Sequence, residues 1–485
     1  MSNKINLGKL PIDVEERIPT PEEVFKVKKL GIREKILYLW GSALIALGVS
    51  IGSGEFLLGP SIAIRIGLML SWLVLIGAFL QTIYIYSYTK LTIATGETPV
   101  TMFFRIGTWA GWVGALGVLL GNIWGGWAYS AAAALAGGFL GRQPTPDDRV
   151  IVGIAGFSLL LLAFVILTLG RRIARTLEIF NWFDLGVVFT SFILLAIILV
   201  PPNIWAELAT GIVSVGNIPP GLDPVVMAAW WGYIGLATGL NYYAVSWFKD
   251  KGYGMSALTG YIPALVGGKK IEISTFGKIF KLNTDNLKIF KRWTRLALEE
   301  LFVIFFLGAI IGMLVPMTLA YAIAKGYNLS LLWGIPLWLS QALNTLYGPA
   351  GYWWGVLVAV FVLFKTQLGI VDAIVRNFAD AAWKLEGVRK FFKNDIRFLY
   401  YTLAAVILAW ASVAFFATAP VALILISANM ANAGAIYGVP FLIYLNYKMP
   451  KELRLHWGLI VLNIVFMIMC LTFMTFSVGR ALGIL

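Results

Sequence analysis

The sequence predicts an all-α membrane protein with about eleven transmembrane helices. Hydrophobic residues make up 59% of the 485 residues, whereas charged residues make up only 13%. A soluble globular protein carries about 25% charged residues, and the mean hydropathy of this chain is +0.83. The apolar residues are also gathered into runs long enough to cross a bilayer, which takes about 20 residues each.

The chain begins with a segment of mixed charge, residues 1–35, followed by a single transmembrane domain, 36–485. The first segment has no apolar core of the kind that a cleaved signal peptide needs, so we interpret it as a cytosolic tail. The predicted spans are 36–65, 67–94, 107–140, 150–170, 180–200, 224–265, 297–325, 350–378, 398–418, 420–446 and 453–480.

Basic loops set the expected orientation of these spans. The 249–295 connection is rich in Lys and Arg, which the positive-inside rule places in the cytoplasm. Alternation then brings the other strongly basic loops to the same side: 171–175, 384–393 and 448–454. The opposite loops are short or rich in Pro and Trp: 144–148, 201–205 and 331–352. We therefore expect a multi-pass plasma-membrane protein with its N-terminus in the cytoplasm.

Two of the runs are interrupted by glycines near mid-span. The first contains Gly52-Ser53-Gly54-Glu55, and the sixth contains Gly235-Leu236-Ala237-Thr238-Gly239-Leu240-Asn241. Glycine costs about 1 kcal/mol in a helix interior, and irregular backbone inside a membrane must face protein or a watery cavity. The alternative is that these glycines only let helices pack closely.

Two interrupted spans, five helices apart, are typical of an inverted-repeat transporter whose substrate site lies at the breaks. We therefore expect the five-plus-five LeuT-type architecture with broken helices 1 and 6. Its repeats would cover about 36–200 and 224–446, followed by an extra helix at about 453–480.

Glu55 is the leading candidate for a binding residue. A charged side chain at the centre of a membrane helix costs about 2.5–3.5 kcal/mol, so it is kept where it faces a cavity, a cation or a partner. Beside the unwound backbone it would form an anionic site rich in oxygen, suited to a hard cation. The alternative is a structural ion pair with Arg65 or Lys365. In the eighth run, Asp372 and Arg376 lie four residues apart and are expected to pair.

The composition restricts the kind of ligand. With one cysteine, Cys470, and one histidine, His456, a zinc or copper site is not expected. The net charge of +14 is explained by the basic loops, so no nucleic-acid partner is expected. The expected partners are the lipid bilayer and a small substrate, without a permanently bound cofactor, and the protein is expected to be a monomer.

Several motifs occur in the order found in one transporter family. They are Gly41-Ser42-Ala43-Leu44-Ile45 through Glu55, Thr95-Gly96-Glu97, Arg175-Thr176-Leu177-Glu178 and Val439-Pro440-Phe441. In these motifs the chain resembles the Nramp family of divalent-metal transporters. The resemblance implies a substrate site made of Val49, Gly52, Ser53, Gly54, Glu55, Ala237, Leu240, Asn241, Tyr242 and Asn432, with Glu55, Asn241 and Asn432 on the metal ion.

The chain departs from the Nramp pattern at the site itself. Gly52 through Glu55 replace the family's Asp-Pro-Gly-Asn, and Leu240-Asn241-Tyr242 replace its Met-Pro-His. Asn432 falls where the family has a glutamine. The family's acidic residues in the third helix are missing from the stretch 121–125, which argues against the family's proton coupling. Loss of the thioether favours harder ions, such as magnesium or manganese.

Two transporter hypotheses remain. The first is a secondary transporter of a divalent metal cation, of the magnesium or manganese/iron type, and the metal ion would be its substrate. The second is a LeuT-type transporter of an amino acid or a cationic organic solute, since bare amides at a half-helix start can hold a carboxylate. An enzyme is not expected, because we find no nucleophile–base pair, phosphate loop or metalloprotease motif.

Overall fold

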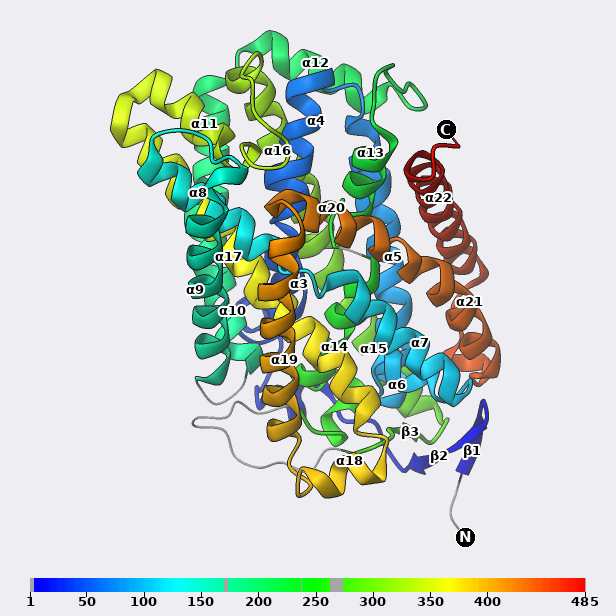
Figure 1. The fold of residues 1–485 in the computed structure, drawn as a ribbon. Helices are drawn as coiled ribbons and strands as arrows, with labels where there is room; N and C mark the ends of the chain where they lie inside the picture. Colours follow the sequence, from blue (N-terminus) through cyan, green and yellow to red (C-terminus); the bar gives the residue numbers. More distant parts are fainter. Residues whose placement is uncertain (1–3, 170–172, 237, 262–273, 485) are drawn as a thin grey trace.

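The computed structural model describes residues 4–169, 173–236, 238–261 and 274–484. Figure 1 shows a bundle of long helices with three short strands at one end, next to the N-terminus. The strands are β1 (Lys4–Leu7), β2 (Leu10–Glu15) and β3 (Lys278–Phe280). We call this end of the molecule the basic end.

Short helices α1 (Pro21–Phe25), α2 (Ile32–Glu34) and η1 (Lys35–Leu39) lead into the bundle. The first half of the bundle comprises α3 (Gly41–Ser50), η2 (Gly54–Leu58), α4 (Gly59–Ile66), α5 (Ser71–Thr95), α6 (Pro99–Phe103), α7 (Thr108–Asn122), α8 (Gly126–Leu140), η3 (Pro146–Asp148), α9 (Arg149–Thr168), α10 (Ile173–Asp184), η4 (Leu185–Phe189), α11 (Thr190–Leu199) and α12 (Pro202–Val213).

The second half comprises α13 (Pro224–Gly232), η5 (Thr238–Leu240), α14 (Asn241–Lys251), η6 (Gly254–Leu258), α15 (Thr284–Glu300), η7 (Leu301–Phe306), α16 (Leu307–Ala324), η8 (Ile335–Leu337), α17 (Trp338–Ala382), α18 (Glu386–Phe391), α19 (Ile396–Ala417), α20 (Pro420–Ala431), α21 (Ala433–Lys448), η9 (Lys451–Leu453) and α22 (Trp457–Ala481).

The predicted all-α membrane class is confirmed. Among the described residues, eight helices are long and apolar enough to cross a membrane, and the bent pair Gly41–Ser50 and Gly54–Ile66 makes nine. The two further predicted spans, 107–140 and 224–265, are each divided into helices of fifteen residues or fewer. Apolar side chains such as Ile154 and Ile197 are two-thirds exposed on the outer helices, as expected of a surface that faces lipid.

Three predicted boundaries were wrong. The sixth span was expected to reach residue 265, but α14 ends at Lys251, where Gly252 adopts a left-handed conformation. The seventh was expected to begin at 297, but its helix begins at Thr284, and the side-chain oxygen of the capping residue Asn283 accepts a hydrogen bond from the amide of Asn286. The stretch 331–352 is largely helical, because α17 begins at Trp338 and continues through a kink at Gly348.

The basic end is covered by the N-terminal segment. β1 pairs antiparallel with β2, and β2 pairs parallel with β3, which lies in the connection between α14 and α15. Beyond the sheet, the carbonyl of Pro19 accepts a hydrogen bond of 2.8 Å from the indole of Trp293 on α15. The segment 4–35 is therefore ordered and bound to the bundle; we call it the strap.

The predicted grouping of basic loops agrees with the arrangement in space. The β3 connection, α18 and the N-terminal strands lie together at the basic end, while α12 and the C-terminus lie at the opposite end (Figure 1). Lys90 on α5 donates a 2.6 Å hydrogen bond to the carbonyl of Arg454, so the 448–454 turn also lies here. Of the predicted 171–175 loop, Arg171 and Arg172 lie outside the described residues.

Candidate functional site

The first predicted break is present. Helix α3 ends at Ser50, Ile51 leaves the helical conformation, and the chain resumes as the π-helix η2 at Gly54, with a bend of 41°. A methyl group added at Gly54 would lie 2.2 Å from the carbonyl oxygen of Tyr233, and one at Gly52 would lie 2.3 Å from the hydroxyl of Thr366. The break therefore needs its glycines because the sixth and eighth spans approach its backbone directly.

The second predicted break is also present. Helix α13 ends at Gly232, and Gly235 takes a left-handed φ of +77° before the chain resumes at η5 and α14. The side-chain oxygen of Gln81, on α5, accepts a 2.7 Å hydrogen bond from the amide of Leu236. An amide freed by the break thus has a fixed partner inside the bundle, as buried backbone requires.

The third span carries a break that the sequence analysis did not predict. Helix α7 ends at Asn122, Gly125 is left-handed with φ of +69°, and α8 starts at Gly126. This break brings Trp127, in the first turn of α8, to the first break, where its indole donates a 2.9 Å hydrogen bond to Ser53.

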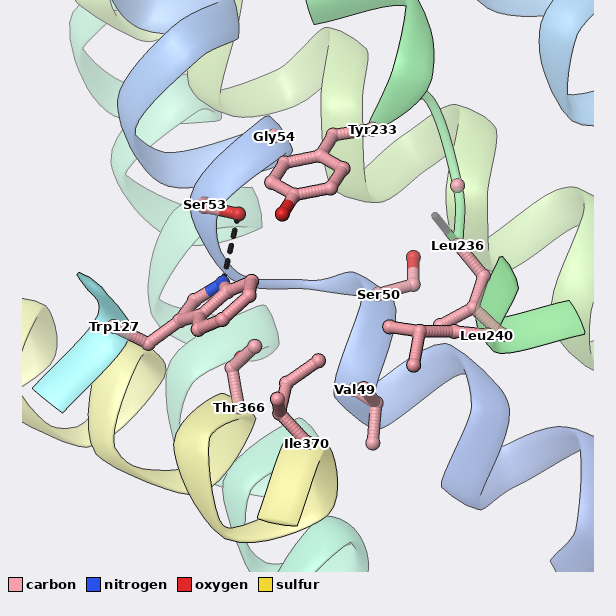
Figure 2. Close-up of a pocket in the computed structure, with 11 residues that line it drawn as sticks. Val49, Ser50, Ser53, Gly54, Trp127, Tyr233, Leu236, Leu240, Thr366 and Ile370 are labelled. Carbon is pink, nitrogen blue, oxygen red and sulfur yellow. Dashed lines mark hydrogen bonds between the residues drawn. The ribbon is translucent and has the colours of Figure 1, made fainter. Parts of the chain in front are cut away.

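A cavity lies between the breaks of the first and sixth spans (Figure 2). It is lined by Val49, Ser50, Ser53, Gly54, Trp127, Tyr233, Gly235, Leu236, Leu240, Thr366 and Ile370. All of these residues are buried. The space free inside the cavity holds about one water molecule.

Three of the four hydroxyl groups that line the cavity donate their protons away from it. Ser50 donates to the carboxylate of Glu55 at 3.0 Å, Thr366 donates to the carbonyl of Val362 at 2.9 Å, and Tyr233 donates to Ser427 at 2.7 Å. A hydroxyl that has committed its single proton can offer only lone pairs to another ligand. These three oxygens therefore face the cavity as acceptors.

The predicted site residues divide into three groups. Val49, Ser53, Gly54 and Leu240 line the cavity. Gly52, Glu55, Asn241, Tyr242 and Asn432 are buried close to the breaks in the chain but are not among the lining residues. Ala237 lies outside the described residues.

Glu55 is fully buried and is directed back toward the break. Its carboxylate accepts hydrogen bonds from the hydroxyl of Ser50 at 3.0 Å and from the amide of Gly52 at 3.2 Å. Lys365 is also buried, and its charge acts on this carboxylate. Arg65, the other partner considered, is exposed near the end of α4. The hydroxyl of Ser50 thus lies between the Glu55 carboxylate and the cavity and contacts both.

The two predicted amides differ in their bonding. Asn432 sits at the turn between α20 and α21 and donates to the carbonyl of Ala228 at 3.0 Å, while its oxygen has no hydrogen-bond partner. Neither polar atom of the Asn241 side chain has a partner, although this residue is fully buried. Unpaired buried amides are costly, so both side chains have acceptor capacity to offer a ligand.

Tyr242 belongs to a separate cluster. Its hydroxyl donates to the carbonyl of Gly434 at 2.7 Å and lies 2.8 Å from the hydroxyl of Tyr84. The rings of Tyr84, Tyr88 and Phe103 pack around it. These contacts join the second, sixth and tenth spans, which gives Tyr242 a packing role in this structure.

Seven residues that line the cavity were not among the predicted site residues: Ser50, Trp127, Tyr233, Gly235, Leu236, Thr366 and Ile370. The glycines of the stretch 121–126 were a signal for the third break, and hydroxyl residues beside the other breaks were a signal for the cavity. Asp372 and Arg376 were predicted to pair, and this is confirmed by a 3.2 Å contact between buried charges. Among the described residues, no group of three or more His, Cys, Asp and Glu could hold a metal ion.

No protein-family model and no curated protein matches the sequence. Solved structures do match. A mutant of the manganese transporter of Eremococcus coleocola has a TM-score of 0.62 at 14% identity, with 97% of this chain and 90% of that chain covered. The same transporter in complex with an aromatic bis-isothiourea substituted compound has a TM-score of 0.61 at 15% identity, covering 94% and 89%.

A second transporter matches less closely. Mhp1, a nucleobase-cation-symport-1 family transporter in a closed conformation with bromovinylhydantoin bound, has a TM-score of 0.52 at 13% identity, covering 91% of this chain and 92% of that chain. The expected likeness to the Nramp transporters is thereby confirmed at the level of the fold. The chain is therefore a multi-pass membrane protein, and its fold is the LeuT-type fold of these solved structures.

Proposed function

We propose that this protein is a secondary transporter of a divalent metal cation, of the magnesium or manganese/iron type, and that the cation binds at the breaks of the first and sixth spans. The observation that carries this proposal is the direction of the hydroxyl protons. Ser50, Tyr233 and Thr366 each donate to an acceptor outside the cavity, so they present oxygen lone pairs to its interior.

Two backbone amides at the breaks support the same substrate. The amide of Gly52 donates to Glu55, and the amide of Leu236 donates to Gln81. A bound carboxylate needs free N–H donors at such breaks, whereas a cation needs oxygen acceptors. The polar groups around this cavity therefore favour a cation over the carboxylate of an amino acid.

Glu55 supplies the negative charge in this proposal. Its carboxylate lies behind Ser50, at the other end of a 3.0 Å hydrogen bond, so it attracts a cation through that hydroxyl and becomes a direct ligand if the hydrogen bond is exchanged for the ion. We propose that two amide oxygens complete the site: that of Asn241, the first residue of α14, and that of Asn432, which would lie 3.0 Å from a methyl group added at Gly232. Glu55, Asn241 and Asn432 are thus our proposed metal-binding residues, together with the backbone near Val49 and Ala237.

The transport cycle that we propose is alternating access between two repeats, about 36–200 and 224–446, around the fixed site. The basic end would face the cytoplasm, in agreement with the positive-inside rule, in the plasma membrane. Divalent metal would be carried as substrate and not as a resident cofactor.

A transporter of a cationic organic solute is the second candidate. The likeness to Mhp1, which has bromovinylhydantoin bound in its structure, favours it, and Glu55 would suit an amine. The size of the cavity favours the metal ion, because the space holds only about one water molecule.

The test is uptake of manganese and magnesium into liposomes that contain the purified protein, with wild type, Glu55→Ala and the control Glu207→Ala on the exposed face of α12. We expect uptake by wild type and the control, and loss of uptake in Glu55→Ala. If folded wild type takes up neither ion, the divalent-cation proposal is wrong and amines should be screened.

A further inference from the structure

Ser427 lies outside the cavity but is hydrogen-bonded to Tyr233, which lines it. It is fully buried on α20, and its hydroxyl accepts the 2.7 Å hydrogen bond from the phenol of Tyr233. The same hydroxyl donates to the carbonyl of Gly121. Because a carbonyl can only accept, the Ser427 proton must point to Gly121, and the proton between Ser427 and Tyr233 must then come from the phenol.

The carbonyl of Gly121 is available for this role because the third span is broken. Gly121 is in the last turn of α7, which ends at Asn122, and the last carbonyls of a helix lack partners within it. In an unbroken helix, this carbonyl would accept a backbone hydrogen bond from within the helix. The break therefore provides the acceptor that fixes the direction of two linked hydrogen bonds, from Tyr233 to Ser427 and from Ser427 to Gly121.

The direction of that chain has a consequence for the ligand. Figure 2 shows the Tyr233 hydroxyl directed toward the cavity, on the side of Ser53. With its proton held by Ser427, the phenol oxygen presents lone pairs, which attract a cation. Without an acceptor at position 427, the buried phenol would turn its proton toward the oxygens of the cavity, since an unmade buried hydrogen bond is costly.

We propose that Ser427 is a positioning residue for substrate selection: through the Gly121 carbonyl it fixes the Tyr233 phenol as an acceptor and so makes the cavity selective for cations. This inference rests on the proposed function, in that it assumes a cation bound in this cavity. It assigns a specificity role to Ser427 on the tenth span and to the Gly121 carbonyl at the break of the third span, and neither residue is among those that line the cavity.

The experiment is a double-mutant cycle on manganese binding, measured by titration calorimetry with manganese chloride on the full chain in detergent. We expect Ser427→Ala to weaken binding by about tenfold, which corresponds to about 1.4 kcal/mol, and Ser427→Thr to bind like wild type. In the Tyr233→Phe background, where no phenol remains to be oriented, Ser427→Ala should have an effect of less than about twofold. The control is Ser158→Ala on the exposed face of α9, which removes a hydroxyl that donates to the carbonyl of Ile154 in its own helix.

Equal effects of Ser427→Ala in both backgrounds would mean that the serine acts by packing alone and would overturn the inference. Unchanged binding in Ser427→Ala would overturn it as well. If Ser427→Ala does not fold, Ser427→Cys takes its place, because a thiol is a similar size but a weak acceptor, and the same non-additivity is expected. Absence of binding by wild type would instead refute the proposed function, and the inference with it.

Discussion

At the scale of single residues, the proposed site depends both on the charge of Glu55 and on the direction of the hydroxyl protons around the cavity. Glu55 was the residue that the sequence analysis favoured, and it is buried at the break as expected. Its carboxylate, however, is bonded to Ser50 and Gly52 and not to open space. A sequence can indicate a buried carboxylate beside a break, but it cannot give the direction of its hydrogen bonds, because those partners are fixed only by the folded backbone.

The substitution Glu55→Gln tests whether charge or hydrogen bonding is needed. The glutamine side chain would keep an oxygen for Ser50 and lose the charge, so we expect the protein to fold and manganese uptake to fall by more than tenfold. Ser50→Ala should have a smaller effect, because the carboxylate stays. Uptake into liposomes and the melting temperature measure the two properties. Normal uptake by Glu55→Gln would assign this residue a purely structural role.

Lys384, just beyond the end of α17 at the basic end, gives a prediction about pH. Burial lowers the pKa of its ammonium group from 10.5 to about 8, against the attraction of Asp380 and Glu97. Between pH 8 and pH 10 the unfolded chain therefore keeps a proton that the folded protein has released, so the free energy of unfolding should rise with pH in this window.

The substitution Lys384→Met removes this titrating group. The melting temperature of wild type should rise between pH 8 and pH 10, and that of Lys384→Met should not. Lys390→Met is the control, because Lys390 is exposed on α18. An equal rise in wild type and Lys384→Met, measured in the same buffers, would contradict the prediction.

At the scale of elements, the breaks of the first and sixth spans could be predicted because glycines are costly inside helices. The break of the third span was missed, since its glycines lie within an apolar run that a continuous helix would also explain. Thr366 and Ser427 were missed for another reason. Serine and threonine are ordinary in membrane helices, where they bond to the carbonyl four residues earlier, as Thr366 does to Val362. Only the folded bundle shows which of them faces a cavity.

Two glycines at the breaks give a matched test of close packing. A methyl group at Gly54 would lie 2.2 Å from the backbone oxygen of Tyr233, whereas one at Gly239 would meet its nearest neighbour at 3.7 Å. Gly54→Ala must therefore displace the sixth span and should cost about 1–3 kcal/mol of stability, with at least a tenfold loss of uptake. Gly239→Ala should resemble wild type in both measurements. Similar effects of the two substitutions would show that the contact between the breaks does not matter.

At the scale of the whole molecule, the basic end is closed by buried charges that join separate spans. Arg376 on α17 pairs with Asp250 on α14 and with Asp372, and Tyr243 and Tyr400 donate hydrogen bonds to Asp372. These contacts tie the second half of the broken sixth span to α17 and α19. We therefore expect a motion that opens the cavity toward the basic end to separate α14 from α17.

The strap adds a second closure at the same end. Glu97, at the end of α5, forms a fully buried ion pair of 2.5 Å with Arg105 and accepts a hydrogen bond from the amide of Gly277 beside β3. Arg105 in turn donates to the carbonyl of Leu10 at 2.9 Å. The N-terminal segment was expected only as a cytosolic tail. Its pairing with β3 was not predictable, because the partner strand lies more than 260 residues away and is three residues long.

Weakening the charge network should change how the cavity is reached. Asp250→Asn removes one charge from the pair with Arg376 and leaves the Asp372 pair in place, so we expect a folded protein in which α14 separates from α17 more often. The single cysteine, Cys470, is buried, so a reporter cysteine can be placed in the cavity wall as Ile370→Cys. A water-soluble maleimide should then label that position several times faster in the presence of Asp250→Asn.

The control is Glu386→Gln, which breaks an exposed ion pair with Lys390 at the same end of the molecule. Exposed pairs contribute about 0–1 kcal/mol, whereas the pair of Asp250 with Arg376 is buried and joins α14 to α17. Labelling should therefore be unchanged in Glu386→Gln. If Asp250→Asn also leaves the labelling rate unchanged, the path to the cavity does not pass between α14 and α17, and the network stabilises the fold without acting as its gate.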